Sequence, residues 1–203
     1  MRKVALIVSS LGVLAVAAGV VFYSIAAKGA SGSKAVSEQA AESLQAKIDA
    51  IKKASDSHTH RRGSSRVELS EAELESYVVY ALKGDIPAQL DSIDVRIAPA
   101  SVSSNSQITF NSNATGNPIF DSLVGGTHNL YVKGNLTGHE GRGKFDLQEV
   151  QVDGIPVPNV LIQALIKRYV KPKYPEVDLN EPFDLPWDIQ ELKLDEGKAT
   201  VIY

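Results

Sequence analysis

The most regular alternation of hydrophobic and polar positions begins at Phe145. Phe145 and Leu147 alternate with polar residues, which is the period of a β-strand. The next apolar pair, Val150 and Val152, is displaced by one position, so an uninterrupted strand would turn it to the other face of the sheet. We therefore predict a β-bulge near Gln148–Glu149, because a bulge inserts one residue into a strand and restores the facing.

A helix is expected directly after this strand. Asp153 and Gly154 end the strand, and Pro156 and Pro158 suit a turn followed by a first helical residue. The helix is expected to run from about residue 159 to 169. Its apolar residues occupy more than half of its circumference: Val160, Leu161, Ile162, Ala164, Leu165, Ile166 and Tyr169. Such a helix is either part of a core or the floor of an apolar groove.

A capping box predicts a second helix earlier in the chain. The hydroxyl of Ser70 and the carboxylate of Glu73 stand three residues apart, the spacing at which each satisfies a backbone N–H of the first turn. The helix is expected to continue to about Leu82, before Lys83 and Gly84. One side of it is apolar and carries Leu74, Tyr77, Val78, Ala81 and Leu82.

Strand patterns dominate the rest of the chain. Residues 107–112 alternate but are mostly polar, which is typical of an edge strand. The alternation slips a second time between the apolar pair Trp187 and Ile189 and the pair Leu192 and Leu194. This slip predicts another bulge near Gln190–Glu191. Further strand-like segments are 93–97, 130–136, 144–152, 187–194 and 199–203, with a short apolar segment between turns at 119–124 and a glycine-rich hairpin turn at 138–143.

These elements together predict an α+β fold. Sequential hairpins favour an antiparallel sheet, and two bulges would bend its long strands. We expect a strongly curved antiparallel sheet of five or six strands wrapped on two helices, preceded by an N-terminal transmembrane helix and a helical and flexible spacer.

The N-terminus has the pattern of a signal anchor, expected over residues 1–28. Arg2 and Lys3 precede an uncharged run from Val4 to Ala27. These 24 residues exceed the ~30 Å hydrocarbon thickness of a bilayer when helical. Cleavage near residues 26–30 is the alternative. The basic residues favour a cytoplasmic N-terminus, which would make this a single-pass inner (cytoplasmic) membrane protein with its C-terminal domain in the periplasm or outside the cell.

Residues 29–66 are expected to form a spacer before a domain at 67–203. A weakly amphipathic helix, as a stalk or on the membrane surface, is indicated by Val36, Ala40, Leu44, Ile48 and Ile51. A polar, basic and flexible stretch follows it.

Charge and cysteine content exclude several classes of function. Residues 1–66 carry 10 basic and 4 acidic residues, a net charge of +6, whereas residues 67–203 carry 11 and 20, a net charge of −9. An acidic domain repels phosphate backbones, so we expect no nucleic acid among its partners. The chain has no cysteine, and therefore no disulfide, thiol nucleophile or thiolate metal site.

The sequence carries no recognisable catalytic or metal-binding motif. No nucleophile elbow or phosphate-binding loop occurs in a strand–helix context. His58 and His60 lack a third ligand nearby, and a solvated linker explains them better than a metal site. His128 and His139 fall at a strand start and in a turn. We expect neither an enzyme nor a cofactor.

One basic cluster stands out in the acidic domain. It follows the apolar helix and comprises Lys167, Arg168, Lys171 and Lys173. These residues either complement the dipole at the end of that helix or contact lipid headgroups at the mouth of a groove.

Three segments together resemble a known family. LSEAEL at the start of the first domain helix, GIPVPNVLIQALI and LPWDIQELKLDEGKATV, behind a membrane anchor, are similar to bacterial membrane-attached phospholipid-binding proteins of the TULIP type, including the YpmS-like and LmeA-like groups. The resemblance implies an elongated curved sheet around helices that holds acyl chains in a hydrophobic groove without catalysis. A signal anchor replaces the cleavable leader expected in the LmeA-like group, which favours action near one membrane.

Two functions from different classes follow. The first is an extracytoplasmic domain that binds phospholipid or another acyl-chain lipid, for lipid transfer or envelope maintenance, with membrane lipids as its partners. Its groove would be lined by Leu74, Tyr77, Val78, Phe145, Leu147, Val160, Leu161, Ala164, Leu165, Tyr169, Trp187 and Ile189. The second is a structural or scaffolding domain of the cell envelope, with a filled core and a protein partner.

Overall fold

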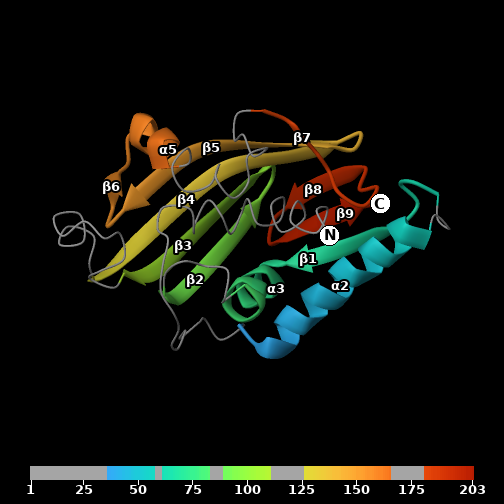
Figure 1. The fold of residues 1–203 in the computed structure, drawn as a ribbon, viewed down its shortest axis with the longest axis horizontal. Coiled ribbons are helices and arrows are strands. Elements are labelled where there is room, and N and C mark those ends of the chain that lie inside the picture. The colour runs from blue at the N-terminus through green and yellow to red at the C-terminus, as the bar shows by residue number, and fades with distance from the viewer. Residues whose placement is uncertain (1–35, 58–60, 83–88, 111–125, 166–180) are drawn as a thin grey trace.

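A computed structural model of the chain describes residues 36–57, 61–82, 89–110, 126–165 and 181–203 (Figure 1). The expected signal anchor, the apolar segment at 119–124 and the basic cluster at 167–173 lie outside these ranges. None of the helices among the described residues has the length and apolar character needed to cross a membrane.

The described residues form one antiparallel sheet of nine strands that does not close, and five or six strands was therefore too low an expectation. The order is β1-β9-β8-β4-β3-β2, with β5 pairing β4, β6 and β7. The strands are β1 (Arg66–Ser70), β2 (Gln89–Ala98), β3 (Ser101–Phe110), β4 (Gly126–His139), β5 (Arg142–Val152), β6 (Ile155–Pro156), β7 (Phe183–Asp184), β8 (Glu191–Asp195) and β9 (Lys198–Ile202). The sequence did not predict β6 and β7, because a strand of two residues is too short to show an alternation of hydrophobic and polar positions.

The predicted bulge in β5 is confirmed. Lys133 of β4 pairs with Glu149, and the next residue, Gly134, pairs with Leu147. Gln148 is therefore the extra residue that lets the apolar positions on both sides of it meet the same face.

The polar strand is not at an edge, so that prediction was wrong. β3 lies between β2 and β4, and it buries Ser104 and Ser106 on the same face as Val102 and Ile108. Ser106 donates its hydroxyl to the carbonyl of Leu130 at 3.3 Å. A small side chain that hydrogen-bonds to the backbone is buried at low cost, so polarity here did not indicate exposure.

The sheet has two parts: a long-stranded part, β2–β5, and a three-stranded part, β1, β9 and β8. Between β4 and β8 the strand pairing is limited to Gly138 and Leu192. The strand expected on both sides of Gln190–Glu191 is not continuous, because Trp187 and Asp188 adopt left-handed backbone angles in a turn and β8 begins only at Glu191.

Two helical segments pack beside the three-stranded part (Figure 1). α2 (Glu38–Ser57) is the helix that we expected in the spacer, but it buries Ala41, Leu44, Ile48 and Ile51, and the last three belong to the main core. α3 (Glu71–Ser76) continues as a π-helical turn, η1 (Tyr77–Ala81). The predicted capping box between Ser70 and Glu73 is confirmed.

A third helix, α5 (Asn159–Leu165), follows β6 at the far end of β5. Val157 and Ile162 pack against a second, smaller core cluster formed by Ile108, Leu130, Val132 and Val150.

Candidate lipid-binding pocket

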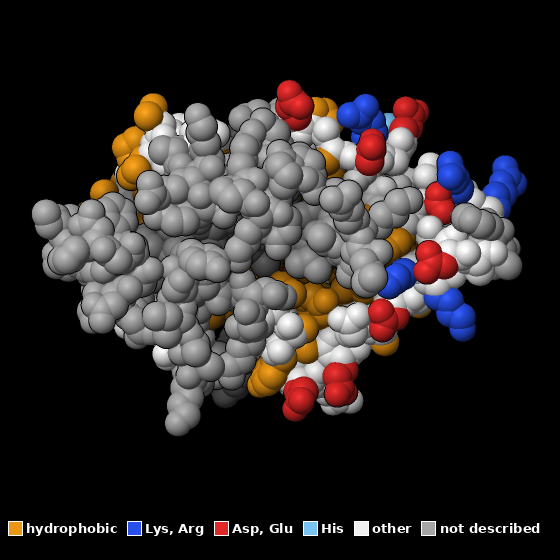
Figure 2. All heavy atoms as spheres, in the orientation of Figure 1, with side chains coloured by type: hydrophobic (Ala, Val, Ile, Leu, Met, Phe, Trp, Pro, Cys, Tyr) orange, Lys and Arg blue, Asp and Glu red, His pale blue; other side chains and the backbone are white. Residues whose placement is uncertain are grey.

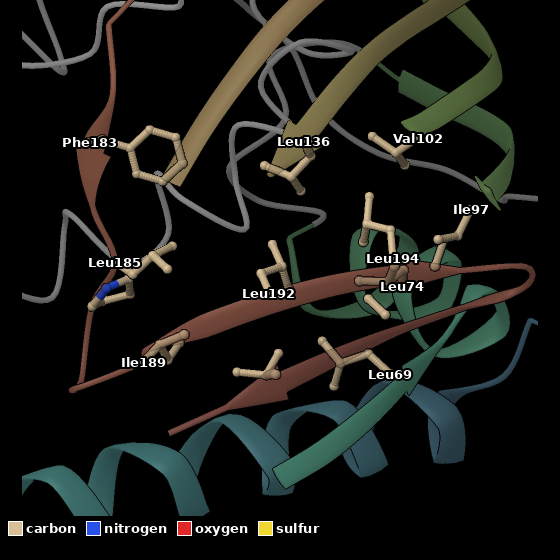
Figure 3. A pocket seen from close by; sticks show the side chains of 13 residues that line it. Leu69, Leu74, Ile97, Val102, Leu136, Phe183, Leu185, Ile189, Leu192 and Leu194 are labelled. Carbon is tan, nitrogen blue, oxygen red and sulfur yellow. The ribbon is translucent and has the colours of Figure 1, made fainter. Parts of the chain in front are cut away.

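An apolar pocket lies where the two parts of the sheet face each other (Figure 3). Its volume is about 60 Å³, several times the ~10–15 Å³ that one water molecule requires. All of its lining residues are apolar: Leu69, Leu74, Ile97, Val102, Leu136, Phe183, Leu185, Pro186, Ile189, Leu192, Leu194, Ala199 and Val201. Water in such a cavity would find few hydrogen-bond partners, so the pocket favours a hydrocarbon guest.

Backbone hydrogen bonds hold the two parts of the sheet together at both ends of this space. At one end the N–H of Gly197 donates to the carbonyl of Ile97 at 2.9 Å, and at the other the N–H of Gly141 donates to the carbonyl of Gln190 at 3.0 Å. Between these points β8 is paired on one side with β9 but meets β4 only at Gly138. The facing side chains therefore enclose a space that neither part fills.

Two glycines shape the wall made by β7 and β8. A Cβ at Gly138 would lie 2.7 Å from the Cβ of Leu192, and a Cβ at Gly143 would lie 2.6 Å from the ring of Phe183. Both distances are shorter than real side chains tolerate. Because glycine has no side chain, Leu192 and Phe183 lie directly on the β4–β5 hairpin. Leu185 also approaches both glycines (Figure 3).

The structure brings Leu74 and Ile189, from the set expected in the groove, to this pocket. Four others are half-buried and pack around the main core: Tyr77, Val78, Leu147 and Trp187. Phe145 is 2% exposed and its ring covers Gly134, so it fills the core. The side chains of Ala164 and Leu165, and Tyr169 with the four basic residues Lys167, Arg168, Lys171 and Lys173, lie outside what the structure describes.

Val160 and Leu161 point away from the core at the far end of the long-stranded part. Their exposed fractions are 83% and 48%, and Ile155 beside them is 70% exposed. α5 thus buries one side through Ile162 and presents the other to solvent.

Most of the pocket lining was not anticipated from the sequence. The alternation of Leu192 with Leu194 and of Ala199 with Val201 indicated strands and an inward face, but not which surface they would meet. Phe183, Leu185 and Pro186 stand in a stretch without a clear period. A signal for this wall was present in Gly138 and Gly143, which stand on the inward phase of two strands where a side chain would be expected.

The carboxylates near the pocket have structural partners. Glu71 and Glu75 of α3 accept the N–H groups of Ile97 (2.7 Å) and Val95 (2.8 Å) on the free edge of β2. Burial raises the pKa of Glu75, which is 3% exposed, and the bond from Val95 opposes this only in part.

Glu73 of α3 binds Lys47 of α2 with an oxygen–nitrogen distance of 2.6 Å. Burial alone would raise the pKa of Glu73, but hydrogen bonds from Lys47, Ser43 and Ser70 outweigh burial and lower this pKa to about 2. These contacts fasten α2 to α3 beside the pocket.

A histidine–carboxylate pair lies at the end of the sheet remote from the pocket. The Nδ1 of His128 is 2.6 Å from a carboxylate oxygen of Asp153, and this bond, with one from the N–H of Asn129, lowers the pKa of Asp153. In the part of the chain that the structure describes, no three potential metal ligands come together.

Comparisons with known proteins do not assign the chain to a family. No protein-family model matches it, and no curated protein matches it in sequence. A crystal structure of lipopolysaccharide binding protein aligns with 68% of this chain and 39% of its own length, at 12% identity and a TM-score of 0.24. The aligned part is less than half of that protein, and a similarity at this TM-score carries no argument about the fold or function of the present chain.

Proposed function

We propose that this domain binds a lipid by the end of one acyl chain, which enters the pocket between the two parts of the sheet. The observation that carries the proposal is the lining: thirteen apolar side chains from seven strands, α3 and the 185–189 segment surround a space that is not filled. No charged side chain lines this pocket. The headgroup of the lipid would therefore stay outside.

The energetics allow a chain end to bind without polar contacts. Each methylene group removed from water contributes about 0.8 kcal/mol, so a few buried groups contribute a few kcal/mol. Binding of this strength suits transient protection of a chain end more than permanent storage of a lipid.

The proposal includes the location of the domain. The uncharged run at Val4–Ala27 is long enough to hold the chain at a cytoplasmic membrane, and the basic residues before it favour a domain on the outer side. A domain held there has membrane lipids within reach, for transfer or for maintenance of the envelope.

One observation favours a structural domain as the second candidate. Ligand sites typically enclose ~300–1,000 Å³, whereas this pocket encloses about 60 Å³. A scaffolding domain would tolerate such a space as a packing defect and would have no use for a guest.

Photo-crosslinking distinguishes the two candidates. The full-length chain is reconstituted in vesicles that contain a phospholipid with a diazirine at the end of one acyl chain, and the labelled peptides are mapped after irradiation. Lipid binding predicts labels on the lining residues of β8 and β9. Ala199→Leu, which adds volume to the lining, should reduce this labelling several-fold.

Thr200→Leu is the matched control, because Thr200 is the next residue of β9 and alternation turns it away from the pocket. It should leave the labelling unchanged. Unlabelled lining peptides, or equal labelling in the Ala199→Leu variant, would exclude the pocket as a lipid site and favour the scaffolding domain.

A further inference from the structure

The exposed apolar side chains of the described residues are concentrated at one place. Four large hydrophobic residues are exposed in the part of the chain that the structure describes, and three of them, Ile155, Val160 and Leu161, lie within seven positions of the chain. The fourth, Tyr80, belongs to η1. Scattered exposed apolar residues are ordinary, but a cluster indicates an interaction surface. We call Ile155, Val160 and Leu161 the apolar tip.

β6 and α5, which carry the apolar tip, lie at the opposite end of β5 from β7 and β8, which line the pocket (Figure 1). Gly143 of β5 lies at the pocket wall, and Val152, which pairs with Ile155, is nine residues further along the strand. At ~3.3 Å per residue this is a separation of about 30 Å. Figure 2 shows hydrophobic side chains gathered at this end, over β6 and α5. The tip is therefore separate from the pocket.

The backbone N–H groups at the apolar tip can be desolvated at low cost. Pro156 and Pro158 have no N–H to desolvate. The N–H of Val157 donates to the carbonyl of Val150 at 2.9 Å, and those of Leu161 and Ile162 donate to the carbonyl of Pro158 at 2.9 and 3.1 Å. Backbone groups bonded within the protein enter an apolar layer at much lower cost than free ones.

The charge pattern also suits a membrane surface. No charged residue occurs from Gly154 to Ile166, and the next charged residues along the chain are Lys167 and Arg168, followed by Lys171 and Lys173. An uncharged apolar stretch followed by cations complements a bilayer, whose apolar layer lies beneath anionic headgroups.

A protein partner fits this surface less well. A stable protein–protein interface takes roughly 20 to 30 residues from each side, whereas three apolar side chains on a two-residue strand and a seven-residue helix make up the tip. Insertion of a few apolar side chains needs no matching surface of that size.

We propose that the side chains of Ile155, Val160 and Leu161 insert into the interfacial layer of a lipid bilayer and dock this end of the domain on the membrane. Docking at the tip orients the long strands relative to the membrane and leaves the pocket about 30 Å away from the inserted residues.

The absence of native cysteine makes a direct test available. Val160→Cys in the full-length chain is labelled with an environment-sensitive fluorophore and mixed with vesicles of phosphatidylcholine and phosphatidylglycerol at 3:1. Insertion predicts a blue-shifted emission that rises several-fold, and quenching by lipids with a spin label near the headgroup. Tyr80→Cys, labelled in the same way, is the matched control, because Tyr80 is also exposed but lies outside the tip. Its emission should change little.

The control also corrects for the N-terminal segment, which would bring both labels to the vesicles equally. Replacing Ile155 and Leu161 by serine in the Val160→Cys protein should abolish most of the emission shift, with the thermal unfolding transition unchanged. Equal emission from labels at 160 and 80 on vesicles would overturn the proposal. A shift at 160 that depends on protein concentration and needs no vesicles would also overturn it, in favour of a protein contact.

This test is independent of the lipid pocket. The Ala199→Leu variant, which should lose acyl-chain labelling, should retain the full emission shift at position 160. Failure of the pocket proposal and failure of the docking proposal are therefore distinguishable.

Discussion

Three glutamates on one short helix, Glu71, Glu73 and Glu75 of α3, have different partners. Glu71 and Glu75 are one helical turn apart and accept two N–H groups on the free edge of β2. An edge strand with unpaired N–H groups attracts other strands, so these two carboxylates also protect the sheet from edge-to-edge association. Glu73 points instead to Lys47 and the cap residue Ser70.

Replacement of Glu73 by glutamine should make the free energy of unfolding less dependent on pH below about pH 4.5. The pKa of Glu73 is lowered to about 2 in the folded protein, from an ordinary value of 4.5. Its ionised form therefore stabilises the fold above pH 4.5, and this contribution is lost as the pH falls from about 4.5 towards 2. We expect Glu73→Gln to cost about 1–3 kcal/mol at pH 7 and progressively less below pH 4.5.

Urea unfolding at a series of pH values measures this difference. Glu42→Gln, at an exposed position of α2, is the control and should change stability little at any pH. A constant difference between Glu73→Gln and the wild type from pH 7 to pH 2 would contradict the assignment.

Among the elements, β4 depends most on residues that lack a side chain. Gly134, Gly138 and Gly143 of β5, which pairs with Gly138, are each covered by a large apolar side chain from a neighbouring element. Phe145 lies across Gly134, and its burial to 2% exposure is possible because nothing projects from β4 at that point. These close approaches hold the long hairpin together and shape the pocket wall.

Gly134→Ala should therefore destabilise the protein by about 1–3 kcal/mol, because the new methyl group would overlap the ring of Phe145. Asn135→Ala, the next and exposed position of β4, controls for the change in strand propensity. In a double-mutant cycle, Phe145→Leu should relieve part of the overlap and give a coupling of at least ~0.5 kcal/mol. Additive effects in chemical unfolding would show that the ring does not occupy this space.

At the scale of the whole molecule, α2 packs into the same core as the sheet. Leu44 is fully buried and belongs to the same core as Leu69 of β1 and Val95 of β2. Lys47 adds a polar contact to Glu73 of α3 and to the carbonyl of Glu68. The packed unit therefore includes α2, whose apolar residues a stalk would leave in solvent.

Leu44→Ala tests this arrangement. Loss of a fully buried leucine side chain should cost about 2–5 kcal/mol in chemical unfolding, whereas the same change on a free stalk would cost almost nothing. Gln39→Ala, at an exposed position of the same helix, should stay within ~0.5 kcal/mol of the wild type.

Features governed by neighbouring residues followed from the sequence by itself. The capping box of Ser70 and Glu73 and the bulge at Gln148 are local, because each is decided by hydrogen bonds or by alternation within a few residues. The antiparallel hairpins followed for the same reason, since a glycine-rich turn joins strands adjacent in the chain.

The tertiary structure decided which surfaces meet. It turned the polar β3 into an interior strand, moved α2 into the core and placed Leu192 and Leu194 opposite Leu136 and Val102. It also left Val160 in solvent, although the helical pattern there favoured burial. A periodic pattern of hydrophobic residues indicates that one face of an element is apolar. The surface that this face packs against depends on contacts between residues far apart in the chain, and a local pattern does not contain them.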